Sequence, residues 1–103
     1  MVSSVASLSA VIKITGIFFS FRKWDDAIKY GQKLLSLNAG QKMNFVLGKC
    51  YYEKEDYGKS FMYLDKAYAE DPKNIEIPTM FARGLVDMSN FKAAAKYYQD
   101  AVQ

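Results

Sequence analysis

The chain contains no histidine and a single cysteine, Cys50, among its 103 residues. Because a disulfide needs two thiols, no intramolecular disulfide can form. A zinc site of the usual spacing needs several His or Cys ligands, so the chain cannot assemble one. The single thiol is compatible with a reducing compartment and favours the cytoplasm without establishing it.

A strong charge of either sign is also lacking. The 14 basic residues nearly balance the 11 acidic ones, and the net charge of +3 is spread without basic runs. This argues against nucleic acid as the partner. The sequence has no Ser/His/Asp set and no glycine-rich phosphate loop, so it offers neither a nucleophile system nor a nucleotide site. We predict that the protein is not an enzyme and needs no cofactor or metal.

Long apolar runs are limited to the N-terminal segment. Between Val5 and Phe19 the only charged residue is Lys13, so the stretch resembles a signal or anchor segment. However, Lys13 lies in its middle, no basic region precedes it, and it is too short to span a bilayer. We predict an amphipathic first helix and no role for a membrane.

Against these absences stands one pattern that occurs three times. Each copy begins with an aromatic residue, Trp24, Tyr57 or Phe91, and these are 33 and 34 positions apart. Small or apolar residues follow at helical spacing, and a second stripe of the same spacing precedes each copy. The repeat unit is therefore a pair of helices. The preceding stripes are Val11, Ile14, Thr15 and Phe18, then Asn44, Leu47, Gly48 and Tyr51, and then Pro78, Phe81, Ala82 and Leu85.

A period of this length predicts an all-α fold, an α-solenoid of three antiparallel helix pairs. Pro72 stops one helix, Asn74 is suited to cap the next, and Gly40 is suited to end the second helix of the first unit. Residues 1–103 form one domain, with repeats of about 8–40, 41–74 and 75–103. The expected helices lie near 4–20, 24–37, 41–54, 57–70, 75–88 and 91–102.

Residues 41–74 closely resemble the tetratricopeptide repeat. Leu47-Gly48, Tyr51, Tyr57, Ala67 and Pro72 stand at the spacings of that family's pattern, while Asn44 replaces its frequent tryptophan. The resemblance extends over about residues 8–103. It implies a right-handed superhelix and recognition of other proteins through its concave face. The function expected from it is that of an interaction scaffold or adaptor.

In that family the first helix of each pair lines the concave groove. Carried over by position, seven residues are the candidate peptide-binding site: Ile12, Phe19, Lys42, Phe45, Lys49, Tyr52 and Arg83. They suit a peptide or helix with apolar anchors and some acidic character. The family's clamp for chaperone tails is missing, because its places hold Ile12, Gly16, Val46, Glu76 and Met80.

Other interpretations remain open from the sequence. The candidate residues can be ordinary solvated side chains, and the chain can be a structural, self-associating segment or a small chaperone-like subunit that shields a helix. Because no solvating helix follows the last repeat, we expect a piece of a longer array or a homo-oligomer formed through uncapped ends. Cys50 is expected to be a structural, partly buried thiol. The residues expected to lie partly uncovered are Phe81, Leu85, Phe91 and Tyr98.

Overall fold

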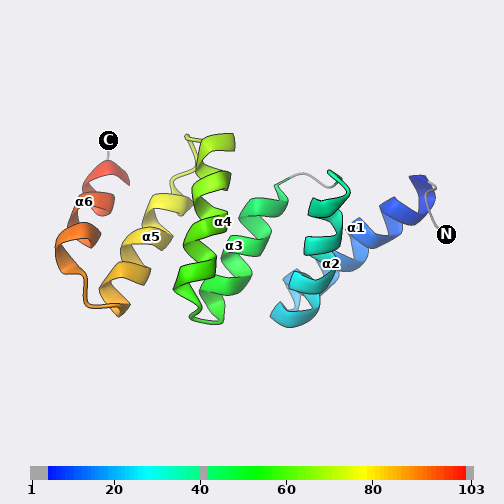
Figure 1. Ribbon diagram of the computed structural model, residues 1–103, viewed down its shortest axis with the longest axis horizontal. Helices are drawn as coiled ribbons and strands as arrows, with labels where there is room; N and C mark the ends of the chain where they lie inside the picture. The colour runs from blue at the N-terminus through cyan, green and yellow to red at the C-terminus, as the bar shows by residue number, and fades with distance from the viewer. Residues whose placement is uncertain (1–4, 40–41, 102–103) are drawn as a thin grey trace.

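In the part of the chain that the computed structural model describes, six α-helices in three antiparallel pairs form an elongated row (Figure 1). The structure describes residues 5–39 and 42–101, with side chains from residue 8 onward except those of residues 97, 98, 100 and 101. The helices are α1 (Val5–Ser20), α2 (Trp24–Ser36), α3 (Met43–Glu53), α4 (Tyr57–Glu70), α5 (Glu76–Asp87) and α6 (Phe91–Ala101). The predicted all-α repeat fold is confirmed. The predicted helix ends at 4, 41 and 102 and the predicted Gly40 cap lie outside the described residues.

The molecule is long rather than spherical. Its principal extents are 49 × 24 × 19 Å and its radius of gyration is 14.7 Å, whereas a compact domain of this length would have about 13 Å. Each helix packs on its neighbours in chain order, so α1 and α6 lie at opposite ends of the row (Figure 1). None of the described helices combines the length and the apolar character needed to cross a bilayer.

The side chains that the structure describes form two separate cores along this row, each between the second helix of one pair and the first helix of the next. The first joins α2 to α3 through Ala27, Ile28 and Leu47. The second joins α4 to α5 through Leu64, Ala67, Ile77, Met80 and Phe81. Each unit thus buries its apolar face against its neighbours. Phe81 is only 5 % exposed, so the expectation that it lies partly uncovered was wrong. Phe61 covers it, with the two ring centroids 4.7 Å apart.

Small residues at the helix contacts have the predicted role. A Cβ added at Gly48 would lie 2.6 Å from Leu64 Cδ2, and Ser60 Oγ donates a 2.7 Å hydrogen bond to the Gly48 carbonyl. Helices α3 and α4 can therefore approach closely. Gly84, which the stripes did not single out, does the same for α5, since its Cβ would lie 2.7 Å from Phe61 Cζ.

The turn within each pair repeats as faithfully as the helices do. Arg22, Glu55 and Ser89 all adopt left-handed backbone conformations, with φ near 60°. The residue after each donates its N–H to a carbonyl five positions back, as Asp56 does to Tyr51 at 2.9 Å. This is the Schellman arrangement that ends a helix. Asn38 ends α2 in the same way.

The first helix departs from the amphipathic prediction. Apolar side chains lie on its covered and uncovered sides alike, because Ile12, Ile14 and Ile17 are 40 %, 37 % and 56 % exposed. Thr15, at the place that Gly48 has in α3, is buried and bonds the Val11 carbonyl at 2.8 Å.

Candidate functional site

The structure brings together three of the seven candidate residues, Lys49, Tyr52 and Arg83. They line a groove between α3 and α5, the first helices of the second and third pairs. On α3, residues 52 and 53 lie one turn after residue 49. On α5, residues 76, 79, 83, 86 and 87 recur with the same helical spacing, so both sets face one side. The groove consists of two adjoining cavities that share Tyr52, Glu53 and Arg83.

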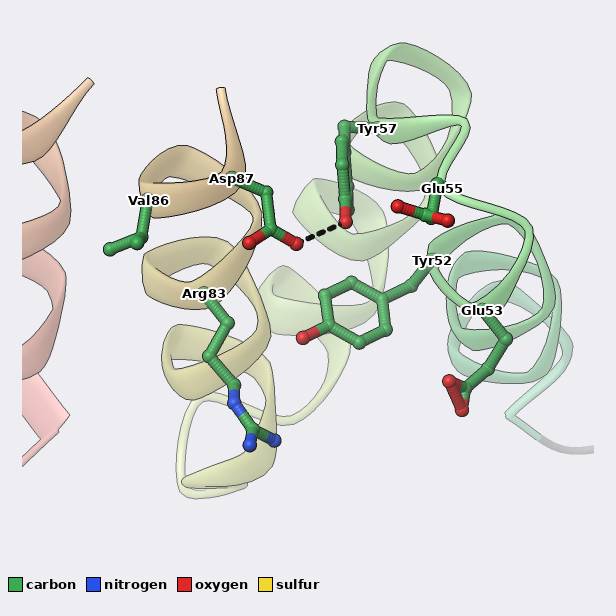
Figure 2. Close-up of a pocket in the computed structure, with 7 residues that line it drawn as sticks. All are labelled: Tyr52, Glu53, Glu55, Tyr57, Arg83, Val86 and Asp87. Atoms are coloured by element: carbon green, nitrogen blue, oxygen red, sulfur yellow. Dashed lines mark hydrogen bonds between the residues drawn. The ribbon is translucent and has the colours of Figure 1, made fainter. Parts of the chain in front are cut away.

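The larger cavity, of about 500 Å³, lies toward the C-terminal ends of the two helices (Figure 2). In it the ring of Tyr52 points from α3 toward α5. The smaller cavity, of about 380 Å³, continues along α5 toward Glu76. The lining residues are Tyr52, Glu53, Glu55, Tyr57, Arg83, Val86 and Asp87 in the first, and Lys49, Tyr52, Glu53, Ile75, Glu76, Thr79, Met80 and Arg83 in the second.

The two cations of the groove differ in their surroundings. Lys49 Nζ lies 3.6 Å from Glu76 Oε2 and 5.9 Å from the centre of the Phe19 ring. Since the two side chains of the ion pair are 35 % and 61 % exposed, solvent screens their attraction and the pair is weak. Arg83 forms no ion pair with any residue that the structure describes, and its guanidinium points away from Asp87 (Figure 2).

A hydrogen bond joins the ends of α4 and α5 at the wall of the larger cavity. Tyr57 Oη donates to Asp87 Oδ2 at 2.5 Å (Figure 2). This bond, with smaller contributions from burial and the carboxylate charges, raises the pKa of Tyr57 above its ordinary value. Sequence reasoning placed Tyr57 in the core stripe and missed its hydroxyl. The signal was available, because Trp24 and Phe91 at the equivalent positions carry no hydroxyl group.

The other four candidates lie elsewhere. Lys42 and Phe45 line a separate cavity of about 410 Å³, with Glu70 and Asp71 among its other residues. Phe19 is half-buried, packs edge-on against Trp24 with ring centroids 5.8 Å apart, and reaches the groove only through Lys49. Ile12 is exposed on α1 and lines none of the three cavities.

Nothing in this part of the molecule is arranged for covalent or metal chemistry. Cys50 is fully buried in the α2–α3 core, rather than partly buried as expected, and burial raises its pKa to about 12. A thiol with such a pKa is not a nucleophile at neutral pH. Among the described residues, no group of three or more Cys, Asp or Glu side chains is placed to hold a metal ion.

The helix pairs, the left-handed turn within each pair and the groove along the first helices define a protein of the tetratricopeptide-repeat class. Residues 22–101, more than half of the chain, match the family described as ANAPC3, anaphase-promoting complex, cyclosome, subunit 3. The chain belongs to this family, whose repeats are of the tetratricopeptide type. No individual curated protein matches the chain in sequence. Repeats of this type serve in protein–protein interaction and are generally not enzymatic.

Proposed function

We propose that the protein is a scaffold or adaptor that binds a peptide or helix of a partner protein in the groove between α3 and α5. The observation that carries this proposal is the continuity of the two cavities through Tyr52, Glu53 and Arg83. A groove formed by two adjoining cavities suits a segment of chain better than a single small molecule. It is also built on helices rather than loops, so its shape is largely formed before binding.

The apolar part of the interaction centres on Tyr52, with Val86 across the larger cavity and Met80 in the smaller one. Tyrosine contributes a large contact area at little entropic cost, and for that reason it is common at the energetic centre of interfaces. An apolar side chain of the partner would lie against this ring. Phe19 of α1 lies next to this site, because Lys49 Nζ is 5.9 Å from the centre of its ring, and it adds a further aromatic side chain beside the groove.

We place the acidic group of the partner in the space between the side chains of Lys49 and Arg83, which line the same cavity. A carboxylate there would take the place of Glu76 beside Lys49 at little cost, because the existing pair is solvent-exposed. Arg83 would bind it through two parallel hydrogen bonds. The larger cavity has three carboxylates, Glu53, Glu55 and Asp87, and one cation, Arg83, whereas the smaller cavity has two of each charge. An acidic group of the partner therefore belongs in the smaller one.

The experiment compares partner capture by the wild-type protein with capture by the double variant Tyr52→Ala, Arg83→Ala. The matched control is Tyr68→Ala, Lys66→Ala, which removes one tyrosine and one cation from exposed positions on α4. We expect partners captured by the wild type and the control to be lost from the groove variant, and their retention to weaken with salt. Equal capture by all three, with helix content unchanged, would reject the groove as the binding site.

A further inference from the structure

A row of apolar side chains on α1 faces away from the rest of the described molecule. Ala10, Ile14, Ile17 and Phe21 follow one another at helical spacing, and all four are exposed. Phe21, directly after the helix, is 72 % exposed and Ile17 is 56 % exposed. No charged residue belongs to this row, which we call the open face of α1.

Three of the four positions of this row are covered in the other two pairs, whereas the counterparts of Phe21, which are Lys54 and Met88, are exposed. The covered counterparts in α3 are Met43, Leu47 and Cys50, which are 8 %, 0 % and 0 % exposed. They pack against α2, the second helix of the preceding pair: Gly31 of α2 leaves room for Leu47, whose Cδ2 would lie 3.2 Å from an added Cβ. Thus this face of a first helix receives the second helix of the pair before it.

The third pair repeats the arrangement. In α5 the counterparts Ile77, Phe81 and Gly84 are buried, and Phe61 of α4 lies against the latter two. The chain therefore shows twice what occupies this face, and in both cases the occupant is a second helix that presents an aromatic or apolar stripe. On α1 none of the described residues fills that place.

At the other end of the molecule lies α6, the second helix of the third pair, and its matching face is uncovered. The positions of α4 that meet α5 include Tyr57 and Phe61, and their counterparts in α6 are Phe91 and Ala95. Phe91 is 65 % exposed and Ala95 is also exposed. The molecule thus carries both halves of its own repeat interface on opposite ends of its long axis (Figure 1).

We propose that copies of this chain associate head to tail, with α6 of one copy lying on the open face of α1 of the next. The contact continues the α2–α3 and α4–α5 interfaces from one molecule to another. Where Asp25 and Lys54 form an ion pair between α2 and α3, the new contact has Lys92 opposite Phe21, so it does not repeat this ion pair. Because the two surfaces differ and lie at opposite ends, each added copy leaves one of each surface available, so assemblies grow with concentration.

The decisive measurement is the mass of the protein by sedimentation velocity over about a hundredfold range of concentration. The variants are Ile17→Glu on the open face and Ala95→Glu on α6, and each is expected to remain a monomer. The matched control is Ile12→Glu, the same substitution on α1 at a residue that is 40 % exposed but lies outside the row. The control is expected to associate like the wild type, whose mean mass rises beyond that of a dimer.

Mixing the two defective variants sharpens the test. Ile17→Glu keeps an intact α6, and Ala95→Glu keeps an intact α1, so one native interface can form between them. The mixture is expected to give a dimer that grows no further, although each variant alone is monomeric. Circular dichroism confirms that every variant retains its helices.

Several outcomes would overturn the proposal. A wild-type monomer at all concentrations would exclude association, including the case in which a segment outside the described residues covers α1. Association that survives Ala95→Glu but not Ile17→Glu would show that α1 pairs with itself. Equal loss in the Ile12→Glu control, or no dimer in the mixture, would show that the row and its α6 counterpart are not the interface.

Discussion

Gly48 of α3 and Leu64 of α4 are so close that no side chain fits between them. A Cβ at Gly48 would lie 2.8 Å from Leu64 Cγ and 3.3 Å from its backbone nitrogen, and Leu64 is fully buried. The clash involves backbone and the branch point of a buried side chain, so it cannot be relieved by turning a flexible end. The two helices would have to separate, which would also lengthen the bond from Ser60 to the Gly48 carbonyl.

We therefore expect Gly48→Ala to lower the free energy of unfolding, even though alanine favours helix by about 1 kcal/mol. Overpacking costs about 1–3 kcal/mol, which leaves a net loss of about 1 kcal/mol, measured by urea titration. Gly16→Ala is the matched control, because the space around Gly16 is open. It is expected to raise stability by about 0.5–1 kcal/mol. Stabilisation by both variants would contradict the close approach of α3 and α4.

The hydrogen bond between Tyr57 and Asp87 predicts an alkaline signature. The pKa of Tyr57 is raised in the folded state. The stabilisation that this hydrogen bond gives is therefore complete below the unfolded pKa of tyrosine, about 10, and is lost as the pH rises through the pKa of Tyr57 in the folded protein. Tyr57→Phe should cost about 1 kcal/mol at pH 7 and should make stability less dependent on pH above about 10. Tyr68→Phe, at an exposed position on the same helix, is the control and should keep the wild-type pH profile.

The helices and their order could be predicted from the sequence because the stripes repeat with a constant period. The predicted helix 57–70 coincides with α4, and 24–37 exceeds α2 by one residue. The left-handed turns could not be predicted in this way. Glycine is the usual residue there, whereas this chain has Arg22, Glu55 and Ser89, so no residue type marked them.

The candidate site was predicted less well, and the reason is geometric. The position of a residue within its helix shows which face of the repeat unit it belongs to. Lys49 and Tyr52 of α3 were therefore predicted to lie on the same face as Arg83 of α5. It does not show how far one helix is displaced along the next. For that reason Lys42 and Phe45 were assigned to the groove although they line another cavity. The bond between Tyr57 and Asp87 was missed for the same reason, because it joins residues 30 positions apart.

Cys50 is expected to be unreactive while the protein is folded. Its pKa of about 12, raised mainly by burial from an ordinary 9.0, lowers the thiolate fraction at pH 8 on the order of a thousandfold. Alkylation by iodoacetamide should therefore be slow in buffer and fast in denaturing urea. Because the folded pKa is the higher one, thiolate formation opposes folding as pH rises above about 9. Labelling at the same rate in both conditions would contradict the burial of this thiol.

Asn44 offers a site where the fold can be made more stable. Its side chain is 8 % exposed; Nδ2 donates to Glu70 at 3.0 Å, but Oδ1 is buried with no hydrogen-bond partner among the described residues. An unsatisfied buried polar atom costs about 1–3 kcal/mol. Leucine has the same branching and no polar atom, so Asn44→Leu should raise the free energy of unfolding by about 1 kcal/mol, measured by urea titration.

The opposite change at this position serves as the control. Asn44→Asp keeps the shape of the side chain but places a carboxylate in a buried position beside Glu70. Burial and the neighbouring charge both disfavour ionisation, so this variant should be less stable than the wild type at pH 7 and should regain stability as the pH falls toward about 4. If Asn44→Leu were destabilising, or if Asn44→Asp were harmless at pH 7, Oδ1 would have a partner that satisfies it, and the polar residue would contribute to the stability of the α3–α4 pair.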